Sequence, residues 1–176
     1  MQDLKLSPTS YIVLGLLDGS PEDEMTPYDI KQRLAVSVDN FWPTPHAQVY
    51  REPERLAAGG YVTERREAAG RRRRFYAITD RGRAAVQAWR HEAPDDLPEL
   101  RDAGVLKLFF DADPGTVADH QLTVHRAKLA EYEALRAEVL ALLTPGQLRA
   151  LDFGIAFERA MVGLWEGLED RPAPAR

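Results

Sequence analysis

Cysteine is absent from this chain of 176 residues, and histidine is scarce. Without cysteine there are no disulfide bonds, thiolate zinc sites or thiol nucleophiles. His120 and His125 stand five positions apart, whereas a helical zinc pair uses a spacing of about four. A phosphate-cradling glycine motif and a nucleophile elbow are also missing. We therefore expect no metal, no cofactor and no enzymatic activity.

Long apolar runs are missing as well. No segment approaches the roughly 18 apolar residues that a membrane-spanning helix needs, and the first six residues lack the charged and apolar regions of a secretory signal. The hydrophobic content of 44% is nevertheless enough for an ordinary folded core. These features predict a soluble, cytoplasmic protein.

Positive charge is in deficit overall but is concentrated in one segment. The net charge is −5, yet residues 1–91 hold 14 Lys and Arg against 12 Asp and Glu, whereas residues 92–176 hold 9 against 16. Between Arg65 and Arg83 there are eight arginines, opposed only by Glu67 and Asp80. We expect a local positive field on an acidic protein, and the acidic second half disfavours nonspecific coating of DNA.

Helix starts are marked by a capping side chain directly before proline. These pairs are Ser7-Pro8, Thr26-Pro27, Thr44-Pro45, Asp113-Pro114 and Thr144-Pro145. They predict helices over 8–18, 27–36, 45–58, 114–143 and 145–168, and Thr79 predicts another over 80–91. Prolines and aspartates begin a linker over 93–104. It separates a domain of residues 1–92 from a helical domain of residues 105–170, which a disordered tail of residues 171–176 follows.

Residues 44–86 place a helix, two β-type runs and another helix in succession. The first helix closes at Gly59-Gly60, and the runs 61–63 and 71–79 flank a turn at 68–70. This order is typical of a winged helix-turn-helix that meets double-stranded DNA. The predicted fold is mostly α-helical with a small β-hairpin: a winged helix-turn-helix domain followed by an α-helical dimerisation domain.

The helix over 45–58 is the expected recognition helix, which presents its first two turns to base edges. Gln48 can pair with adenine and Arg51 with guanine, and Val49 can touch a thymine methyl group. Glu52 and Glu54 would repel phosphate and are expected to face away. His46 of the same helix is also expected to contact bases, and Thr44, just before the helix, to lie near phosphates.

Four successive arginines, Arg71, Arg72, Arg73 and Arg74, follow the expected hairpin turn. Alternate residues of an extended strand share a face, so Arg71 would act with Arg73, and Arg72 with Arg74. One pair is expected to reach phosphates or the minor groove, with Arg72 and Arg73 nearest the tip. The alternative is a merely solvated hairpin surface.

Apolar residues of the second half recur at alternating spacings of three and four. The first long helix carries a seam of Leu122, His125, Leu129 and Tyr132, and the second carries one stripe of Leu151, Ile155, Val162 and Trp165 and another of Phe153, Phe157 and Leu164. A helix that is apolar on two faces needs two partners, one within the chain and one in a second copy. We assign the seam and the first stripe to a homodimer interface. The alternatives are a larger monomeric bundle and, for His125, a buried polar residue.

An ordered set of motifs covers residues 4–90. They are Tyr11…Leu14-Gly15-Leu16-Leu17, Tyr28-Asp29-Ile30, Phe41-Trp42, Val49-Tyr50-Arg51-Glu52, Gly60-Tyr61-Val62 and Phe75-Tyr76-Ala77-Ile78-Thr79. In this order they resemble PadR-type transcriptional regulators, and residues 106–110 and 153–165 resemble the longer members. The resemblance implies a repressor that binds a palindromic operator as a homodimer and is released by a small aromatic or amphipathic effector. It also implies that Tyr50 lies in the helix that contacts DNA; the alternative for Tyr50 is a core aromatic that supports this helix. Aromatic residues near the linker would line its pocket or simply pack: Phe41, Trp42, Trp89, Phe109 and Phe110.

Two prolines depart from the family pattern. Pro27 stands where a glycine is usual and serves as a first-turn residue. Pro53 replaces an apolar residue of the recognition helix and removes the hydrogen bond to the Val49 carbonyl, which costs about 3 kcal/mol in a regular helix. We expect a kink between Val49 and Pro53. If it abolishes base reading, the chain is a winged-helix protein-interaction module; a helical small-molecule scaffold is the other alternative.

Overall fold

The computed structural model describes residues 4–68, 72–94 and 99–169. The chain divides into two compact units, residues 1–96 and residues 97–176. The first unit contains α1 (Pro8–Asp18), α2 (Pro27–Ala35), the short 3-10 helix η1 (Val38–Asn40), α3 (His46–Ala58), β1 (Val62–Arg66), β2 (Arg74–Ile78) and α4 (Asp80–Arg90). This order of three helices, a hairpin and a further helix is that of a winged helix-turn-helix, as predicted.

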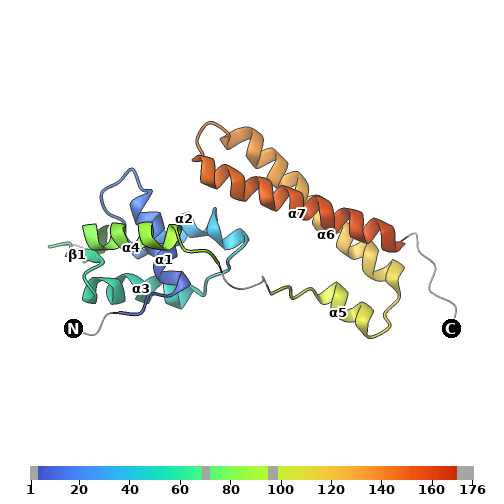
Figure 1. Cartoon of the computed structure of the whole chain (residues 1–176), viewed down its shortest axis with the longest axis horizontal. Helices are drawn as coiled ribbons and strands as arrows, with labels where there is room; N and C mark the ends of the chain where they lie inside the picture. Colours follow the sequence, from blue (N-terminus) through green and yellow to red (C-terminus); the bar gives the residue numbers. More distant parts are fainter. Residues whose placement is uncertain (1–3, 69–71, 95–98, 170–176) are drawn as a thin grey trace. The chain divides into compact units, whose positions relative to one another are not determined.

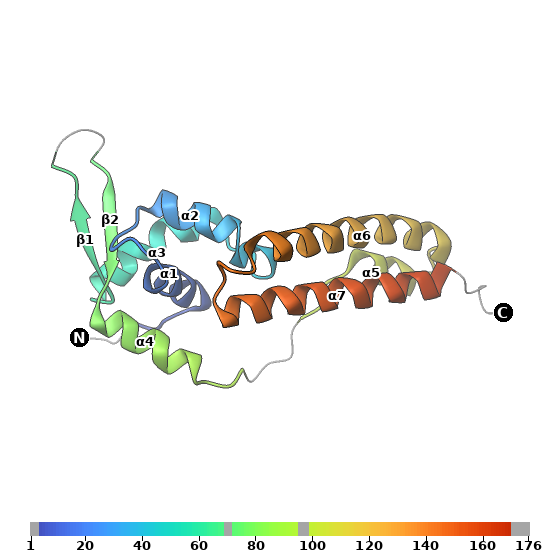
Figure 2. The ribbon, with the colours of Figure 1, turned by 90° about the horizontal axis from the view of Figure 1, so that it is seen from above.

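The wing, residues 62–78, is a two-stranded antiparallel hairpin. Val62 pairs with Ile78 and Arg66 with Arg74, and the hairpin extends away from the helices of the first unit (Figure 2). Met25, just before α2, exchanges backbone hydrogen bonds with Tyr76. The base of the wing is therefore fixed to the helical part of the unit.

Local capping determines where most helices begin. The Ser7 and Thr26 side chains form capping boxes with the third residues of α1 and α2. Thr79 accepts a hydrogen bond from the Gly82 N–H at the start of α4. These contacts need only neighbouring residues, and they confirm the predicted starts.

Apolar side chains from α1, α2, α3, the wing and α4 form one core. Gly82 allows α4 to approach the wing, because a Cβ at this position would clash with the Tyr61 carbonyl oxygen. Tyr11 of α1 stacks on Trp89 of α4, with ring centroids 4.8 Å apart. The most deeply buried members are Val13, Leu14, Ile30, Leu56, Tyr76 and Val86. This shared core holds α3 and the wing in one framework.

The second unit consists of α5 (Ala103–Phe109), α6 (Pro114–Val139) and α7 (Pro145–Glu169). The two long helices lie side by side, as Figure 1 shows, and α5 packs on α6. Leu122, Met161 and Trp165 form the centre of its core. Asp102 caps α5 by accepting a hydrogen bond from Val105 N–H at 2.9 Å, so this helix begins within the predicted linker.

The helix α6 ends at Val139, earlier than the predicted end at residue 143. The chain has to turn before Pro145 starts α7, and a residue that precedes proline disfavours helical geometry. Thr144 forms the expected cap, since its hydroxyl accepts a hydrogen bond from Gln147 N–H at 3.3 Å. The apolar residues 140–143 therefore form the connection and not a last helical turn.

Candidate nucleic-acid interface

The recognition helix α3 has a buried face and an exposed face. Val49, Glu52, Pro53 and Leu56 are buried at the helical spacing of three and four. The exposed face carries four of the predicted DNA contacts: His46, Gln48, Tyr50 and Arg51. Tyr50 is 46% exposed, so it lies outside the core that was its alternative location.

Two of the expected DNA contacts have to be corrected. Val49 is 2% exposed and packs in the core, so its side chain has no access to a thymine methyl group. Thr44 is also buried; its hydroxyl donates to the Trp42 carbonyl at 3.1 Å and its N–H donates to Asp39 Oδ1 at 2.9 Å. The helix begins one residue later than expected, at His46, with no side-chain cap. Thr44 is therefore neither the cap of α3 nor turned to phosphate.

A buried polar cluster fixes α3 to α1. Glu52 is 8% exposed and accepts hydrogen bonds from Ser10 Oγ at 2.6 Å and from Arg55 Nε and Nη2 at 2.9 and 2.6 Å. Arg55 also donates to Ser10 Oγ at 2.7 Å and to the Lys5 carbonyl at 3.0 Å. The hydrogen bond with Glu52 raises the pKa of Arg55. This anchor cluster of Ser10, Glu52 and Arg55 holds the Glu52 carboxylate against α1. Glu52 nevertheless lines the same hollow as Gln48 and Arg51, so the expectation that it faces away stays a prediction.

The exposed face borders a shallow hollow of about 450 Å³. Gln48, Arg51 and Trp42 line it together with Lys5 and with Glu52 and Arg55 of the anchor cluster. The Thr9 hydroxyl donates to Gln48 Oε1 at 3.1 Å, which orients the amide. The structure thus brings two base-reading candidates together beside a lysine and an indole.

Pro53 does not end the recognition helix. The helix runs without interruption from His46 to Ala58, and Pro53 is buried within it. Its ring therefore contributes to the core on the side opposite the exposed face. The kink expected between Val49 and Pro53 stays a prediction.

The arginine run does not form the regular strand that was predicted. The second strand begins at Arg74, and Arg72 has a φ of 49°. A left-handed residue of this kind belongs to a hairpin turn, and it breaks the alternation of faces. The proposed sharing of faces by Arg72 and Arg74 is therefore wrong. Arg71 and Gly70 lie outside the described residues.

Glutamate side chains form ion pairs with the arginines of the wing. Arg73 Nη2 lies 2.9 Å from Glu67 Oε1, and hydrogen bonding to Arg73 lowers the pKa of Glu67. The guanidinium groups of Arg65 and Arg73 also lie over the Phe75 ring, 4.3 and 5.5 Å from its centroid. The other pairs are Arg65 with Glu24, Arg66 with Glu64, and Arg74 with Glu54 of α3. Sequence reasoning missed Glu24, which lies far from the wing along the chain.

Most residues assigned to a dimer pack α6 against α7 within one chain. Leu122, Tyr132, Ile155 and Trp165 are at most 8% exposed, while Leu129, Leu151 and Val162 are half-buried. His125 Nδ1 lies 2.6 Å from Glu158 Oε2 of α7. The exposed stripe of α7 is instead the second one, Phe153, Phe157 and Leu164. The four buried members are therefore used within one chain, and a role of the half-buried members in a dimer stays a prediction. Both stripes of α7 have the same period, and only the packing shows which one faces α6.

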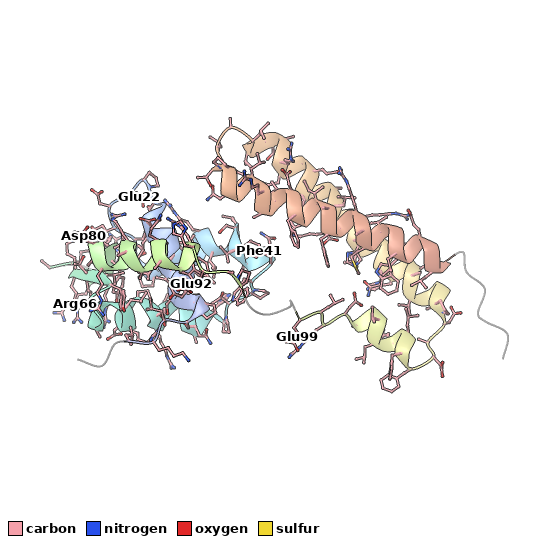
Figure 3. All side chains as sticks on the ribbon, viewed as in Figure 1. Glu22, Phe41, Arg66, Asp80, Glu92 and Glu99 are labelled. Carbon is pink, nitrogen blue, oxygen red and sulfur yellow. The ribbon has the colours of Figure 1, made fainter. Side chains whose placement is uncertain are left out.

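The aromatic residues considered for an effector pocket are all exposed, by 43% to 79%. In the first unit, Trp42 lines the hollow beside α3 and Trp89 stacks on Tyr11. Figure 3 labels Phe41 and Arg66, which lie towards opposite ends of that unit in this view. In the second unit, Phe109 and Phe110 meet edge to face at 5.2 Å. Their role in effector binding stays a prediction.

Within residues 4–68, 72–94 and 99–169, no group of three His, Asp or Glu side chains is arranged to hold a metal ion. Among the same residues, no helix is both long and apolar enough to cross a lipid bilayer.

The first unit defines the class of the protein as a winged helix-turn-helix protein. Residues 13–88 match the model of the transcriptional regulator PadR-like family. A relative, the negative transcriptional regulator PadR of Bacillus subtilis (strain 168), is 28% identical over 154 residues, which cover 82% of this chain and 81% of the relative. The chain is thus similar to PadR-like transcriptional regulators, in residues 13–88 by the family model and over 154 residues by this relative.

Solved structures share this fold along most of the chain. Bacillus subtilis PadR in complex with operator DNA aligns with a TM-score of 0.79 at 24% identity, covering 91% of this chain and 96% of that one. Bacillus subtilis PadR in complex with p-coumaric acid aligns with a TM-score of 0.74 at 23% identity, covering 94% and 97%. The likeness therefore extends through both units.

Proposed function

We propose that this protein represses transcription as a homodimer that binds an inverted-repeat operator. The observation that carries the proposal is the exposed face of α3, which presents Gln48 and Arg51 in the same compact unit as an arginine-bearing wing. Side chains of this kind read adenine and guanine in the major groove. The wing supplies cations for the phosphates or the minor groove. Residues 1–92 are accordingly the DNA-binding domain.

The second unit supplies the dimer in this proposal. Phe153, Phe157 and Leu164 leave an apolar stripe exposed on α7, and two copies joined through residues 105–170 would bury it. A two-fold dimer places its recognition helices in major grooves about 34 Å apart. The operator is therefore expected to be an inverted repeat. This site of action agrees with the cytoplasmic location expected from the sequence.

A small aromatic acid is the proposed effector. The relative from Bacillus subtilis has been solved both with operator DNA and with p-coumaric acid. This chain exposes Trp42 and Phe110 among the aromatics of its two units, and such rings can stack on a planar ligand. Binding that alters the spacing of the two recognition helices would release DNA. A regulator of this kind needs no catalytic group.

Selection of genomic DNA tests the proposal. Sheared genomic DNA of the source organism is incubated with the purified protein, and the retained fragments are sequenced. We expect a few inverted repeats to be enriched, and their enrichment to be lost when Arg72 and Arg73 are both changed to alanine. Absence of enrichment at low salt would refute repression by the free protein and favour the interaction module.

A further inference from the structure

Four carboxylates surround the arginines of the wing. Resting on the function proposed above, we propose that Glu24, Glu54, Glu64 and Glu67, the acidic collar, compete with DNA phosphates for the wing arginines. The collar thereby limits the affinity of the protein for DNA of any sequence.

Glu67 holds Arg73 through the donors that a phosphate would use. Its carboxylate accepts from Arg73 Nη2 at 2.9 Å, and from Nε and the backbone N–H at 3.4 Å each. Paired oxygens that face a guanidinium in this way imitate a phosphate group. The Arg73 side chain remains 61% exposed. DNA can therefore reach the guanidinium, but it has to replace Glu67.

Glu24 holds Arg65 in the same manner from outside the wing. Arg65 Nε donates to Glu24 Oε2 at 2.9 Å, and its Nη2 forms a second bond to the same carboxylate. Arg65 lies opposite Phe75 in the strand register, and both Arg65 and Arg73 contact that ring. The two guanidinium groups are thus held at one aromatic side chain, each by its own carboxylate.

The two remaining members engage the arginines at the outer end of the described strands. Arg66 Nε lies 2.5 Å from Glu64, and Arg74 Nη1 lies 3.0 Å from Glu54 of the recognition helix. Four arginines of the wing are therefore each paired with one of four carboxylates: Arg65, Arg66, Arg73 and Arg74. Arg72 is exposed and has no ion-pair partner among the residues that the structure describes.

Stability of the fold does not explain this arrangement. Ion pairs between exposed side chains contribute little to folding, and the arginine of every pair is at least 39% exposed. We expect these ion pairs to affect the affinity for DNA more than the stability of the fold. Each cation that neutralises a phosphate releases counterions, which adds about 0.9 to the slope of log affinity against log salt. An arginine that stays paired with its carboxylate neutralises no phosphate, so it adds nothing to this slope.

The substitution Glu67→Gln tests the collar. The affinity for a labelled random-sequence duplex is measured between about 50 and 200 mM salt for the wild type and for Glu67→Gln. One freed arginine should raise the affinity about tenfold at the lower salt and about threefold at the higher, and steepen the slope by about 0.9. Glu24→Gln should act in the same way through Arg65.

The matched control is Glu99→Gln. It changes the net charge equally, but its carboxylate pairs with Arg101 in the second unit, and we expect an affinity within twofold of the wild type. The double variant Glu67→Gln, Arg73→Ala should lose the increase in duplex affinity that Glu67→Gln alone produces. The collar is refuted if Glu67→Gln and Glu99→Gln behave alike, or if the gain survives without Arg73. A wild type that binds no duplex at low salt would instead refute DNA binding itself.

Discussion

Removal of the Glu52 carboxylate should loosen the recognition helix from its support. Glu52 is 8% exposed and accepts three hydrogen bonds from Ser10 and Arg55. Loss of one partner of a buried polar group costs about 1–3 kcal/mol. The Arg55 side chain is 36% exposed and regains water, so we expect Glu52→Ala to cost about 2 kcal/mol. Ser10→Ala should cost about 1 kcal/mol, because Arg55 still holds the carboxylate.

Urea unfolding of the full chain, followed by tryptophan fluorescence, measures this loss. Trp42 and Trp89 report on the first unit, and Trp165 on the second. Glu54→Ala is the control, because Glu54 lies on the same helix but its side chain is 63% exposed; exposed positions usually change stability by about 0.5 kcal/mol or less. Equal urea midpoints for Glu52→Ala and Glu54→Ala would refute the anchoring role of Glu52.

Three further predictions concern packing and pH. Gly82→Ala should destabilise the first unit by about 3 kcal/mol in urea unfolding, since the new Cβ clashes with the Tyr61 carbonyl oxygen and overpacking costs about 1–3 kcal/mol; an unchanged midpoint would contradict this packing. Gly104→Ala should destabilise the second unit and change the emission of Trp165, because the Cβ would lie 2.8 Å from Trp165 Cη2; unaltered emission and stability would speak against it. Burial raises the pKa of Tyr132, so its stabilising contribution is complete below about pH 10, the ordinary tyrosine value, and is lost as the pH rises through the higher folded pKa. Burial also raises the pKa of Tyr11 and Tyr76, so unfolding above about pH 10 should show a loss of stability that is smaller in Tyr132→Phe than in the wild type but not absent. Equal alkaline losses in the two proteins would exclude Tyr132 as a source.

Local features of the fold were readable in the sequence. Ser7, Thr26 and Thr79 begin their helices as predicted, because capping involves only residues within one helical turn. The hairpin was also predicted, although its strands differ from the expected ranges. Arg72 adopts a left-handed conformation that no local residue preference indicated, and this moved the start of β2 to Arg74.

The sequence did not show which side of each helix is buried, nor which residues far apart in the chain form ion pairs. Val49 sits among candidate base-reading residues, but the packing of α3 on its unit turns it into the core. On α7 the stripes that contain Ile155 and Phe157 fit the helical period equally well, and only the position of α6 decides between them. Glu24 reaches Arg65 across 41 positions of the chain. A contact of this length depends on the completed fold.

The ratio of affinities for an inverted repeat and for a scrambled duplex measures how far this protein reads DNA sequence. The repeat is taken from the genomic selection, and both duplexes are measured at about 150 mM salt. We expect the wild type to bind the repeat at least about a thousandfold more tightly than the scrambled duplex. Gln48→Ala and Arg51→Ala should each lower this ratio by about tenfold or more, since a bidentate base contact contributes about 1–3 kcal/mol of discrimination. Equal affinities for the two duplexes would contradict a sequence-reading regulator.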